Sequence, residues 1–433
     1  MINVVELFAG VGGFRVGLEK ASKDFRIVMA NQWEPSTKSQ PAYECYKKNF
    51  QSTDEEAVNE DIADIIPIIP QHDLLVGGFP CQDYSVARTL AGEMGIAGEK
   101  GVLFFEIMKV IHQNKPRFVL LENVDRLLKS PSKQRGRDFS VMLASLQKQG
   151  YNVEWRVINA ADYGFPQRRR RVFIFAYRKD TNYAKEQKKL GFDTVLKDKG
   201  FFAKQFPVKE EYNPRHQSRK FELPDNLLDV SDNFSAKYLN SGLIIDNQVY
   251  TAEIQPVERK AITLGEILEI AREYQGPVGE KYYLKDDVKN KKNRTEYEEM
   301  VYQKGAKKEK RVSKSGHEYH YTEGSMSFPD RLDLPSRTML TSEGTKNRSS
   351  HVVEDLDTGR IRFLTPVECE LLNGFDPDWT NTGMPERTRY FCMGNALVVG
   401  LVEKMGKHIV EIYKNENVEK NNQNSDIQQL ALF

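Results

Sequence analysis

The sequence has few cysteines and no long apolar run, and both absences exclude whole classes of protein. Only four cysteines occur in 433 residues, and none belongs to a CxxC pair or a Cys/His cluster. A disulfide framework and a zinc site are therefore not expected, and each cysteine is either a core residue or a reactive thiol. No apolar run approaches the roughly 18 residues of a membrane span, and the opening MINVVELFAG lacks a signal-peptide pattern. We expect a cytoplasmic protein with no metal and no membrane partner.

Strong net charge and internal repeats are also missing. The formal charge is +1 at pH 7, so the overall balance neither requires nor excludes a nucleic-acid partner. The distribution of charge along the chain has to decide that question. The length allows a large core and more than one domain.

The first part of the chain alternates short apolar runs with longer amphipathic ones. This pattern is typical of βα units around a mostly parallel sheet, so we predict a doubly wound α/β fold. The predicted strands are 3–8, 27–31, 73–77, 118–122, 153–159 and 171–177, and the clearest predicted helices are 13–21, 101–113 and 138–149.

Residues 181–357 differ in character, with dense Lys, Tyr, Asn and Glu and no sustained βα rhythm. One helix is well signalled there, because Thr263 and Glu266 can form a capping box and Gly276 follows the apolar pattern. We therefore predict a second, smaller and irregular domain. The predicted division is 1–180 for the first domain, 181–357 for the second, 358–415 for a segment completing the first, and 416–433 for a polar tail that frays.

The glycine cluster LFAGVGGF follows the first predicted strand and opens the first helix. Glycine lets a backbone approach a ligand closely, and helix N–H groups can receive polar atoms, so a nucleoside ligand fits here. A tight turn without a ligand is the alternative. Arg15 stands where the third glycine of G-x-G-x-x-G belongs, so a nicotinamide-dependent oxidoreductase is not favoured.

Cys81 lies in DLLVGGFPCQ, directly after a buried strand. Ligands of open α/β sheets bind beyond the carboxyl ends of strands, which is where this loop falls. A lone cysteine is more often buried and inert, but Gly77, Gly78 and Pro80 describe a shaped loop. A nucleophilic thiol there needs nearby positive charge to ionise.

Two further segments offer complementary groups. FVLLENV places Glu122 at the end of another apolar run, and PQRRRRVF places Arg169 and Arg171 at the start of a strand. Alternate strand residues share a face, so these two arginines are predicted to point together. Taken singly, Glu122 could cap a helix and the arginines could be a solvated charge run. Together they predict a thiol, a carboxyl and guanidiniums at neighbouring strand ends.

In this order, these segments resemble the DNA cytosine-5 methyltransferase family. The matching blocks are VELFAGVGGF, GGFPCQDYS, LLENVDRLL, YGFPQRRRRVF, RFLTPVECELLNGF and MGNALV. The resemblance implies the fold of S-adenosylmethionine-dependent methyltransferases, with 181–357 as the target-recognition domain.

The resemblance also implies catalytic roles. Cys81 would attack C6 of a cytosine, and Glu122 would contact the ring N3 and the amino group. Arg171, with Arg169, would hold Glu122, a phosphate or the base. The target base would be flipped out of double-stranded DNA, because the chemistry cannot take place inside a duplex.

S-adenosylmethionine is the implied cofactor, with S-adenosylhomocysteine as product. The positions carried over for it are Phe8, Ala9, Gly10, Gly12, Gly13, Phe14, Gln32, Trp33, Asp61, Ile62, Pro80, Leu103, Asn395 and Ala396. Two of them depart from the family pattern: Gln32 replaces the usual ribose-binding Glu, with Glu34 nearby, and Ala396 replaces a serine. Asp61 could equally be a helix cap.

DNA contacts are expected mainly from the second domain. Lys304 to Lys314 is a basic run with one acidic residue, typical of a phosphate-contacting surface, although a solvated loop is the alternative. Residues 336–350 carry side chains suited to base edges. The predicted DNA-binding residues are Gln82, Ser85, Lys307, Lys308, Arg311, Arg337, Thr338, Thr341, Ser342 and Arg348.

We therefore expect a sequence-specific DNA cytosine-5 methyltransferase that protects sites from a cognate restriction endonuclease of the same prokaryotic system. The enzyme is expected to be a monomer that forms no stable complex with the endonuclease. A transfer RNA cytosine-5 methyltransferase with the same motifs is the near alternative. A catalytically silent DNA-binding homologue is less favoured, because Cys81, Glu122, Arg169 and Arg171 are all present.

Overall fold

This computed structural model describes residues 1–79, 103–211, 218–312 and 316–430, and the chain forms two compact units. Unit 1 comprises Met1–Tyr163, Arg170–Arg259 and Val399–Phe433, and unit 2 comprises Gly164–Arg169 and Lys260–Val398. The units change at 259 and 398, and both positions lie C-terminal to the predicted boundaries at 180 and 357. Residues up to 259 belong with the first unit, and residues up to 398 belong with the second.

Unit 1 is built on a ten-stranded mixed sheet with the order β3-β2-β1-β4-β5-β7-β6-β9-β10-β8. Strands β3 to β5 in this order pair in parallel, and the remaining pairs are antiparallel. The predicted α/β fold is confirmed, and each predicted strand is present. The strands are β1 Ile2–Leu7, β2 Phe25–Asn31, β3 Ala57–Val58, β4 Leu74–Gly78, β5 Phe118–Val124, β6 Tyr151–Asn159, β7 Arg170–Arg178, β8 Arg219–Glu222, β9 Ser241–Ile245 and β10 Gln248–Ala252.

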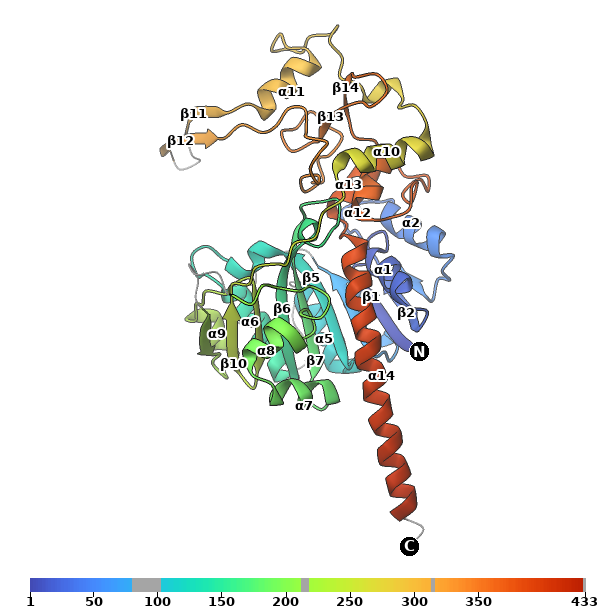
Figure 1. Ribbon diagram of the computed structural model, residues 1–433, viewed down its shortest axis with the longest axis vertical. Helices are drawn as coiled ribbons and strands as arrows, with labels where there is room; N and C mark the ends of the chain where they lie inside the picture. Colours follow the sequence, from blue (N-terminus) through green and yellow to red (C-terminus); the bar gives the residue numbers. More distant parts are fainter. Residues whose placement is uncertain (80–102, 212–217, 313–315, 431–433) are drawn as a thin grey trace. The chain divides into compact units, whose positions relative to one another are not determined.

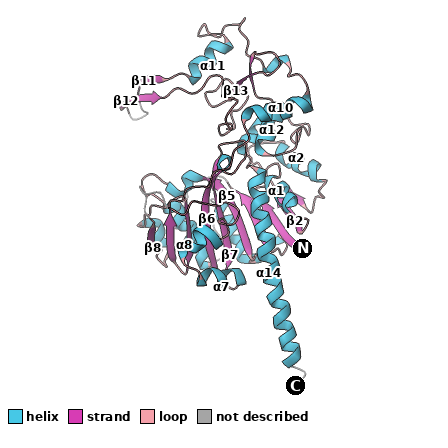
Figure 2. Ribbon diagram, viewed as in Figure 1, coloured by secondary structure: helices cyan, strands magenta, loops and turns pink. Residues whose placement is uncertain are grey.

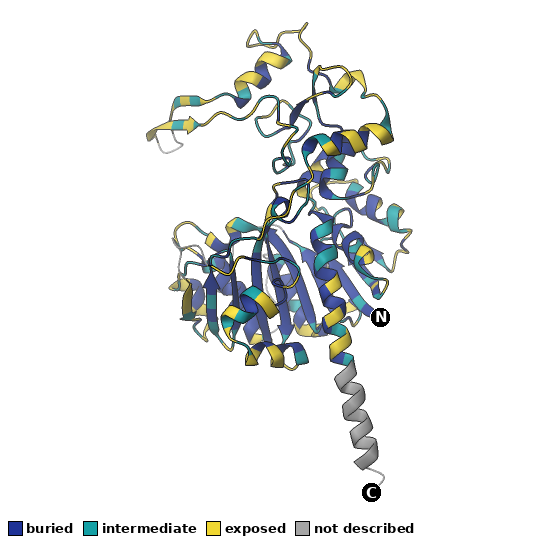
Figure 3. Ribbon diagram, viewed as in Figure 1, coloured by how far each residue is buried: buried dark blue, intermediate teal, exposed yellow. Residues whose placement is uncertain are grey.

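Helices cover the sheet of unit 1, and the sheet is buried between them (Figures 1 and 3). The apolar sides of α5 and α6 pack on the sheet, with Phe104, Phe139 and Trp155 fully buried in a continuous core. This burial is the main term that stabilises the unit. The helices are α1 Gly13–Ala21, α2 Pro41–Phe50, α3 Ile62–Ile65, α5 Leu103–Asn114, α6 Arg137–Lys148, α7 Asn182–Lys189, α8 Phe192–Thr194, α9 Leu227–Asp232 and α14 Val399–Leu430.

Strands β8, β9 and β10 are the reason why the first predicted boundary is wrong. Strand β9 pairs with β6, so the segment extends the same sheet although no βα rhythm announces it. Antiparallel strands can be joined by short turns, and Asp246 and Asn247 make such a turn with positive φ between β9 and β10. The Asp246-Asn247 turn that joins the two strands lies in a part of the sequence rich in polar residues, so it did not stand out as a hairpin.

Helix α14 begins at Val399 and continues to Leu430, so it includes most of the tail 416–433 that was predicted to fray. Its first turns are anchored against α1, and extending an existing helix costs far less than starting one. Gly17 of α1 lies so close to α14 that an added Cβ would be 2.6 Å from the Cβ of Val402. Within the described ranges no helix, α14 included, is long and apolar enough to cross a bilayer.

Unit 2 is smaller and consists of helices with two small sheets (Figure 2). The predicted capping box of Thr263 and Glu266 is confirmed at the start of α10, and Gly276 ends that helix. A small core forms around Leu284, Met300 and Val352. The elements are α10 Leu264–Gln275, α11 Glu296–Lys304, β11 Lys307–Val312, β12 Glu318–Glu323, β13 Val352–Glu354, β14 Ile361–Phe363, α12 Pro366–Asn373 and α13 Glu386–Asn395.

The contact between α1 and α14 gives a test of the fold of unit 1. Replacing Gly17 with valine forces added atoms into Val402 and the Val399 carbonyl, so we expect a loss of about 1–3 kcal/mol in unfolding free energy. Urea unfolding measures it. Gly191→Val is the control, since nothing lies within 4 Å of an added Cβ there. Equal destabilisation by both substitutions would contradict tight packing at Gly17.

Candidate functional site

The turn between β1 and α1 has three residues in the left-handed region, Phe8, Gly10 and Gly12, with φ of 55°, 56° and 89°. Glycine is required at two of them for different reasons. An added Cβ at Gly12 would lie 2.3 Å from the ring of Phe50, so Gly12 permits close packing below the turn. At Gly10 no atom of the described residues lies within 4 Å of an added Cβ, so within that part of the chain this residue faces open space. The turn can therefore admit a ligand beside Gly10, before Gly13 opens the helix.

Gln32, directly after β2, supports this turn. Its side-chain oxygen accepts a hydrogen bond from the backbone N–H of Gly10 at 2.7 Å, and its amide nitrogen lies 3.5 Å from Oε1 of Glu34. The backbone N–H of Ala9 also donates to the carbonyl of Asn31, at 2.9 Å. The side-chain oxygen of Gln32 therefore already accepts a hydrogen bond from the protein backbone. The carboxylate near this amide is that of Glu34.

The other predicted cofactor positions of unit 1 surround the same strand ends. Trp33 is 39% exposed beyond β2, whereas Phe14 and Ile62 are buried. Asp61 accepts a hydrogen bond from the N–H of Ala63 at 3.0 Å, so the helix-cap alternative is realised. Leu103 is the first residue of α5 and is half-buried.

A buried acid below the turn was not identified from the sequence. Glu6 of β1 is fully buried, and its Oε2 accepts a hydrogen bond from the hydroxyl of Tyr46 at 3.1 Å. Its Oε1 has no hydrogen-bond partner among the residues that the structure describes. Burial raises the pKa of Glu6 to about 8, although the hydrogen bond from Tyr46 opposes this shift. The guanidinium of Arg15 stacks over Phe50, 4.2 Å from the ring centroid. The sequence signal that could have identified this buried acid is the position of Glu6 inside the apolar run VVELF.

At the end of β5, Glu122 lies 2.8 Å from Nε of Arg171 on β7, and it is only 9% exposed. The ion pair fixes the carboxylate on the edge of the sheet where the parallel strands end. The neighbouring Asn123 donates from Nδ2 to the carbonyl of Phe79 at 2.8 Å. This bond joins the ends of β5 and β4 just before the segment that carries the predicted nucleophile. Pro80, Cys81, Gln82 and Ser85 lie outside the described residues.

Arg169 is placed differently from its predicted partner. Strand β7 begins at Arg170, so the alternation that was to align Arg169 with Arg171 does not extend to it. Arg169 belongs to unit 2, is 1% exposed, and donates to the carbonyls of Met339 and Gly394 at 3.1 and 2.9 Å. These contacts of Arg169 join two segments of unit 2, and the shared face with Arg171 stays a prediction.

Asn395 and Ala396 end α13 in unit 2, as its last residue and its C-cap. The preceding Gly394 allows a close approach of two backbones, because an added Cβ would lie 2.5 Å from the N of Thr341. The motif MGNALV therefore has a packing role in addition to any contact with a cofactor.

The loop 336–350 is held by arginines that the sequence suggested for DNA. Arg337 pairs with Asp330 at 2.6 Å and donates to the carbonyls of Ser349 and Ser350. Arg348 donates to the carbonyls of Gln303 and Gly305, among others. Arg337 thus bonds groups inside the loop and Asp330 outside it, whereas Arg348 ties the loop to residues 303 and 305.

The serine and threonine residues of that loop also contact other groups of unit 2. Thr338 donates to the carbonyl of Arg168 at 2.6 Å, and the hydroxyl of Ser342 lies 3.0 Å from that of Ser349. Thr341 is half-buried, and its carbonyl accepts from Arg387.

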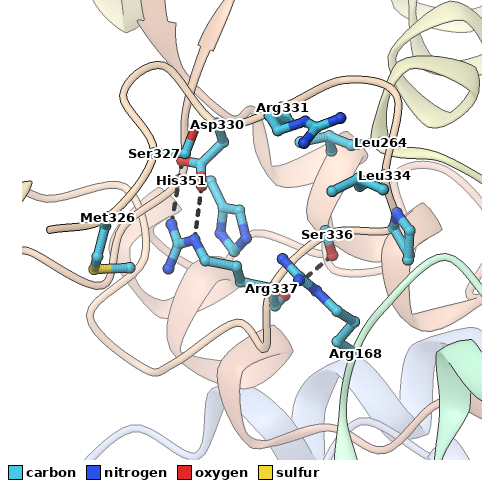
Figure 4. A pocket seen from close by; sticks show the side chains of 11 residues that line it. Arg168, Leu264, Met326, Ser327, Asp330, Arg331, Leu334, Ser336, Arg337 and His351 are labelled. Atoms are coloured by element: carbon cyan, nitrogen blue, oxygen red, sulfur yellow. Dashed lines mark hydrogen bonds and ion pairs between the residues drawn. The ribbon is translucent and has the colours of Figure 1, made fainter. Parts of the chain in front are cut away.

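A pocket of about 220 Å³ opens beside this loop in unit 2 (Figure 4). Arg168 and Arg331 reach its edge, and Asp330 on its wall is paired with Arg337 and with the buried Lys304 at 2.8 Å. The ion pair with Arg337 lowers the pKa of Asp330 well below its usual range in spite of burial. His351 also lines the pocket, and its Nδ1 is bonded to Glu343. The pocket wall is therefore a charge network that is compensated internally.

The predicted basic residues lie on β11. Lys308 is exposed, whereas Lys307 lies 3.9 Å from Glu323 and Arg311 lies 3.0 Å from Glu309. Of the cysteines, Cys45, Cys369 and Cys392 are buried, and burial raises the pKa of the Cys369 thiol. These three are packing residues.

The whole chain is similar to one protein family. The model for "C-5 cytosine-specific DNA methylase" matches residues 2–411. The Type II methyltransferase M.Sau3AI of Staphylococcus aureus is 50% identical over 415 residues, which cover 95% of this chain and 96% of that protein. The Type II methyltransferase M.BanI of Aneurinibacillus aneurinilyticus is 25% identical over 96% of this chain and 97% of its own length. A solved structure of DNMT2 from Spodoptera frugiperda has a TM-score of 0.57 at 13% identity, over 95% of this chain and all of that one, which supports the fold.

The buried Glu6 predicts a dependence of stability on pH. The folded protein keeps its proton up to about pH 8, whereas an exposed glutamate loses it near 4.5. The contribution of Glu6 to stability is therefore fully present below about pH 4.5 and is lost as the pH rises through about 8. The glutamine of the Glu6→Gln variant is neutral at every pH. As the pH rises, we therefore expect the unfolding free energy of this variant to fall by a few kcal/mol less than that of the wild type.

Urea unfolding at about pH 5 and about pH 9 measures this difference. The exposed Glu44→Gln is the control and should follow the wild type. A Glu6→Gln variant with the same pH dependence as the wild type would show that Glu6 does not carry the effect.

Proposed function

Because this chain belongs to the C-5 cytosine-specific DNA methylase family, we propose that it is the sequence-specific modification enzyme of a Type II restriction-modification system. It is a DNA cytosine-5 methyltransferase, and its substrate is double-stranded DNA. The observation that carries the proposal is the pair of Glu122 and Arg171 at the sheet edge, 2.8 Å apart. The pair lies beside Gly78 at the end of β4, where an added Cβ would be 3.3 Å from Oε2 of Glu122. The identity of 50% to a Type II methyltransferase over nearly the whole chain supports the restriction-modification role.

Cys81 is the nucleophile in this proposal. Its thiolate adds to C6 of the cytosine, and the electron pair of the C5–C6 double bond makes C5 nucleophilic. After C5 is methylated, the C5 proton leaves and the thiolate is eliminated, which restores the double bond. The bond from Asn123 to the carbonyl of Phe79 supports this role, because it anchors the chain two residues before Cys81.

Glu122 holds the cytosine at N3 and its amino group, which lowers the cost of the thiolate addition. The carboxylate must point in one direction to do this, and Arg171 restricts it by the ion pair. Arg171 is therefore a positioning residue for Glu122. Arg169 contributes within unit 2, by holding residues 339 and 394 in place.

S-adenosylmethionine supplies the methyl group when bound. The residues of unit 1 fit it: open space beside Gly10, the N-terminus of α1 at Gly13, and the exposed ring of Trp33 for the adenine. Glu34 is the better partner for the ribose hydroxyls, because the side-chain oxygen of Gln32 already accepts from Gly10. Asn395 and Ala396 complete the set in the family pattern.

The target cytosine leaves the duplex to reach Cys81 and Glu122, at a cost of a few kcal/mol in unstacking. Unit 2 reads the sequence, and Gln82 and Ser85 contact the DNA from the nucleophile loop. Methylation protects the site from an endonuclease of the same system, with which the enzyme forms no stable complex. The enzyme acts as a monomer in the cytoplasm.

Covalent trapping tests the nucleophile. We expect duplexes with 5-fluorocytosine to remain attached to the protein through denaturation in the presence of S-adenosylmethionine, because a C5 fluorine cannot leave as a proton does. Cys81→Ser should abolish attachment and methyl transfer while retaining cofactor binding, and Cys45→Ser is the control at a buried packing cysteine. Attachment that survives Cys81→Ser would exclude this nucleophile. Attachment to transfer RNA but not to DNA would assign another substrate.

The glutamate gives a separate prediction. Glu122→Gln keeps the size of the side chain but removes the charge that pairs with Arg171 and the carboxyl group that can give a proton to N3, so we expect single-turnover methylation to slow by roughly 10²-fold or more. DNA binding should change little. Glu106→Gln, on α5, is a control at another buried acid. A nearly normal rate for Glu122→Gln would contradict the role at N3.

A further inference from the structure

Strands β11 and β12 form a hairpin that extends beyond α11 in unit 2 (Figures 1 and 2). The two strands pair antiparallel over six residues each, from Lys307 opposite Glu323 to Val312 opposite Glu318. Side chains alternate between the two sides of such a ribbon. The ribbon therefore has two distinct faces. The charged side chains of one face are paired within the protein, and those of the other face are not paired with any residue that the structure describes.

One side, which we name the inner face, consists of Lys307, Glu309, Arg311, Tyr319, Tyr321 and Glu323. Its charges are paired within the protein: Lys307 with Glu323 at 3.9 Å, and Arg311 with Glu309 at 3.0 Å. The guanidinium of Arg311 also lies 3.6 Å from the ring centroid of Tyr321.

Helix α11 connects to the hairpin through this inner face. The hydroxyl of Tyr302 donates to Glu309 at 3.2 Å, and its ring centroid lies 4.7 Å from Nζ of Lys307. An isolated two-stranded hairpin is only marginally stable, so these contacts supply the stabilisation that the ribbon needs.

The opposite side, the outer face, consists of Lys308, Lys310, Val312, Glu318, His320 and Thr322. All six side chains are exposed, and none has a hydrogen bond or ion pair within the described part of the chain. Lys308 stands directly opposite Thr322, and Lys310 directly opposite His320. Across the ribbon from each lysine there is thus a side chain that could form hydrogen bonds with a ligand. The acid of this face, Glu318, lies at the far end from Lys308.

We propose that the hairpin lies in the major groove of the DNA substrate with its outer face toward the DNA. Lys308 and Lys310 contact phosphates, and His320 and Thr322 contact base edges. This inference rests on the proposed function, because it names how that enzyme engages its duplex. It also revises the sequence prediction for Lys307 and Arg311, which brace the ribbon and do not bind DNA.

The dimensions and the charge agree with this placement. The major groove is about 12 Å wide and admits a two-stranded ribbon, whose strands lie about 4.8 Å apart. Residues two apart on a strand are separated by about 7 Å, which spans about two phosphates at 3.4 Å of helix axis each. Lysines without intramolecular partners can neutralise phosphates without first breaking a bond, and the paired inner face keeps the ribbon ordered before binding.

The first test compares salt dependence of binding to a duplex that carries the enzyme's own site, identified by sequencing 5-methylcytosine in DNA from cells that express it. Lys308→Gln with Lys310→Gln should reduce the slope of log K against log salt concentration by about 2. Lys291→Gln with Lys292→Gln removes the same charge from another exposed part of unit 2 and should leave the slope unchanged. The inner-face pair Lys307→Gln and Arg311→Gln should also leave it nearly unchanged.

The second test addresses the groove. Replacing purines of the site with 7-deazapurines removes the N7 acceptor from the major groove and should weaken wild-type binding. His320→Ala with Thr322→Ala should lower the discrimination between the site and single-mismatch duplexes by roughly tenfold without changing the salt slope. Thermal unfolding of each variant checks that the fold is kept.

The outcomes separate the two proposals. A wild-type enzyme that methylates no DNA would overturn the proposed function itself. Normal methylation, combined with equal salt slopes for outer-face and control variants, would overturn the ribbon alone. A reduced slope with no effect of 7-deazapurines or of His320→Ala and Thr322→Ala would overturn the groove placement, since the outer face would then contact phosphates only.

Discussion

The candidate catalytic chemistry of unit 1 depends on the parallel pairing of β2, β1, β4 and β5. Parallel strands all end at the same edge of a sheet, so the residues that follow them are brought together without any further contact. The glycine-rich turn, Gln32, Phe79 and Glu122 all follow from this one constraint. Two hydrogen bonds then fix their register, from Gly10 to Gln32 and from Asn123 to Phe79.

The sequence predicted those strand ends well because local patterns encode them. Apolar runs followed by glycine or by a polar residue identify the ends of β1, β4 and β5, and a capping box identifies α10. Family motifs added what a lone pattern cannot give, namely the chemical role of each loop. The six strands predicted in the first part of the chain all exist.

Other features could not be predicted, because they depend on partners far away in the sequence. Arg169 was predicted to act with Arg171 beside Glu122, and Arg337 was predicted to contact DNA. The guanidinium of Arg169 donates to the carbonyls of Met339 and Gly394, and that of Arg337 pairs with Asp330. Likewise, Lys307 and Lys308 are adjacent in the sequence and differ only in the side of a strand they occupy. Strands β8 to β10 lack a βα rhythm, and only their pairing with β6 joins them to the sheet.

Buried charge is treated differently in the two units. In unit 1, burial raises the pKa of Glu6 to about 8 in spite of the hydrogen bond from Tyr46, so this acid stays neutral at pH 7. In unit 2, Asp330 stays ionised between Arg337 and Lys304, and Arg362 is bonded to both Asp355 and Glu368. In unit 2 the buried charges are therefore neutralised by opposite charges, whereas unit 1 is stabilised mainly by a large apolar core. A smaller unit with irregular loops can bury less apolar surface.

The packing of α14 on α1 has a consequence for synthesis of the protein. Helix α1 follows the glycine-rich turn near the start of the chain, and its partner α14 begins only at Val399. A nascent chain on the ribosome therefore carries an exposed apolar side on α1 until almost the whole sequence has been translated. Unit 1 cannot complete its fold one segment at a time, and a chain that stops before α14 would leave the ribosome without a finished methyltransferase domain and prone to aggregation.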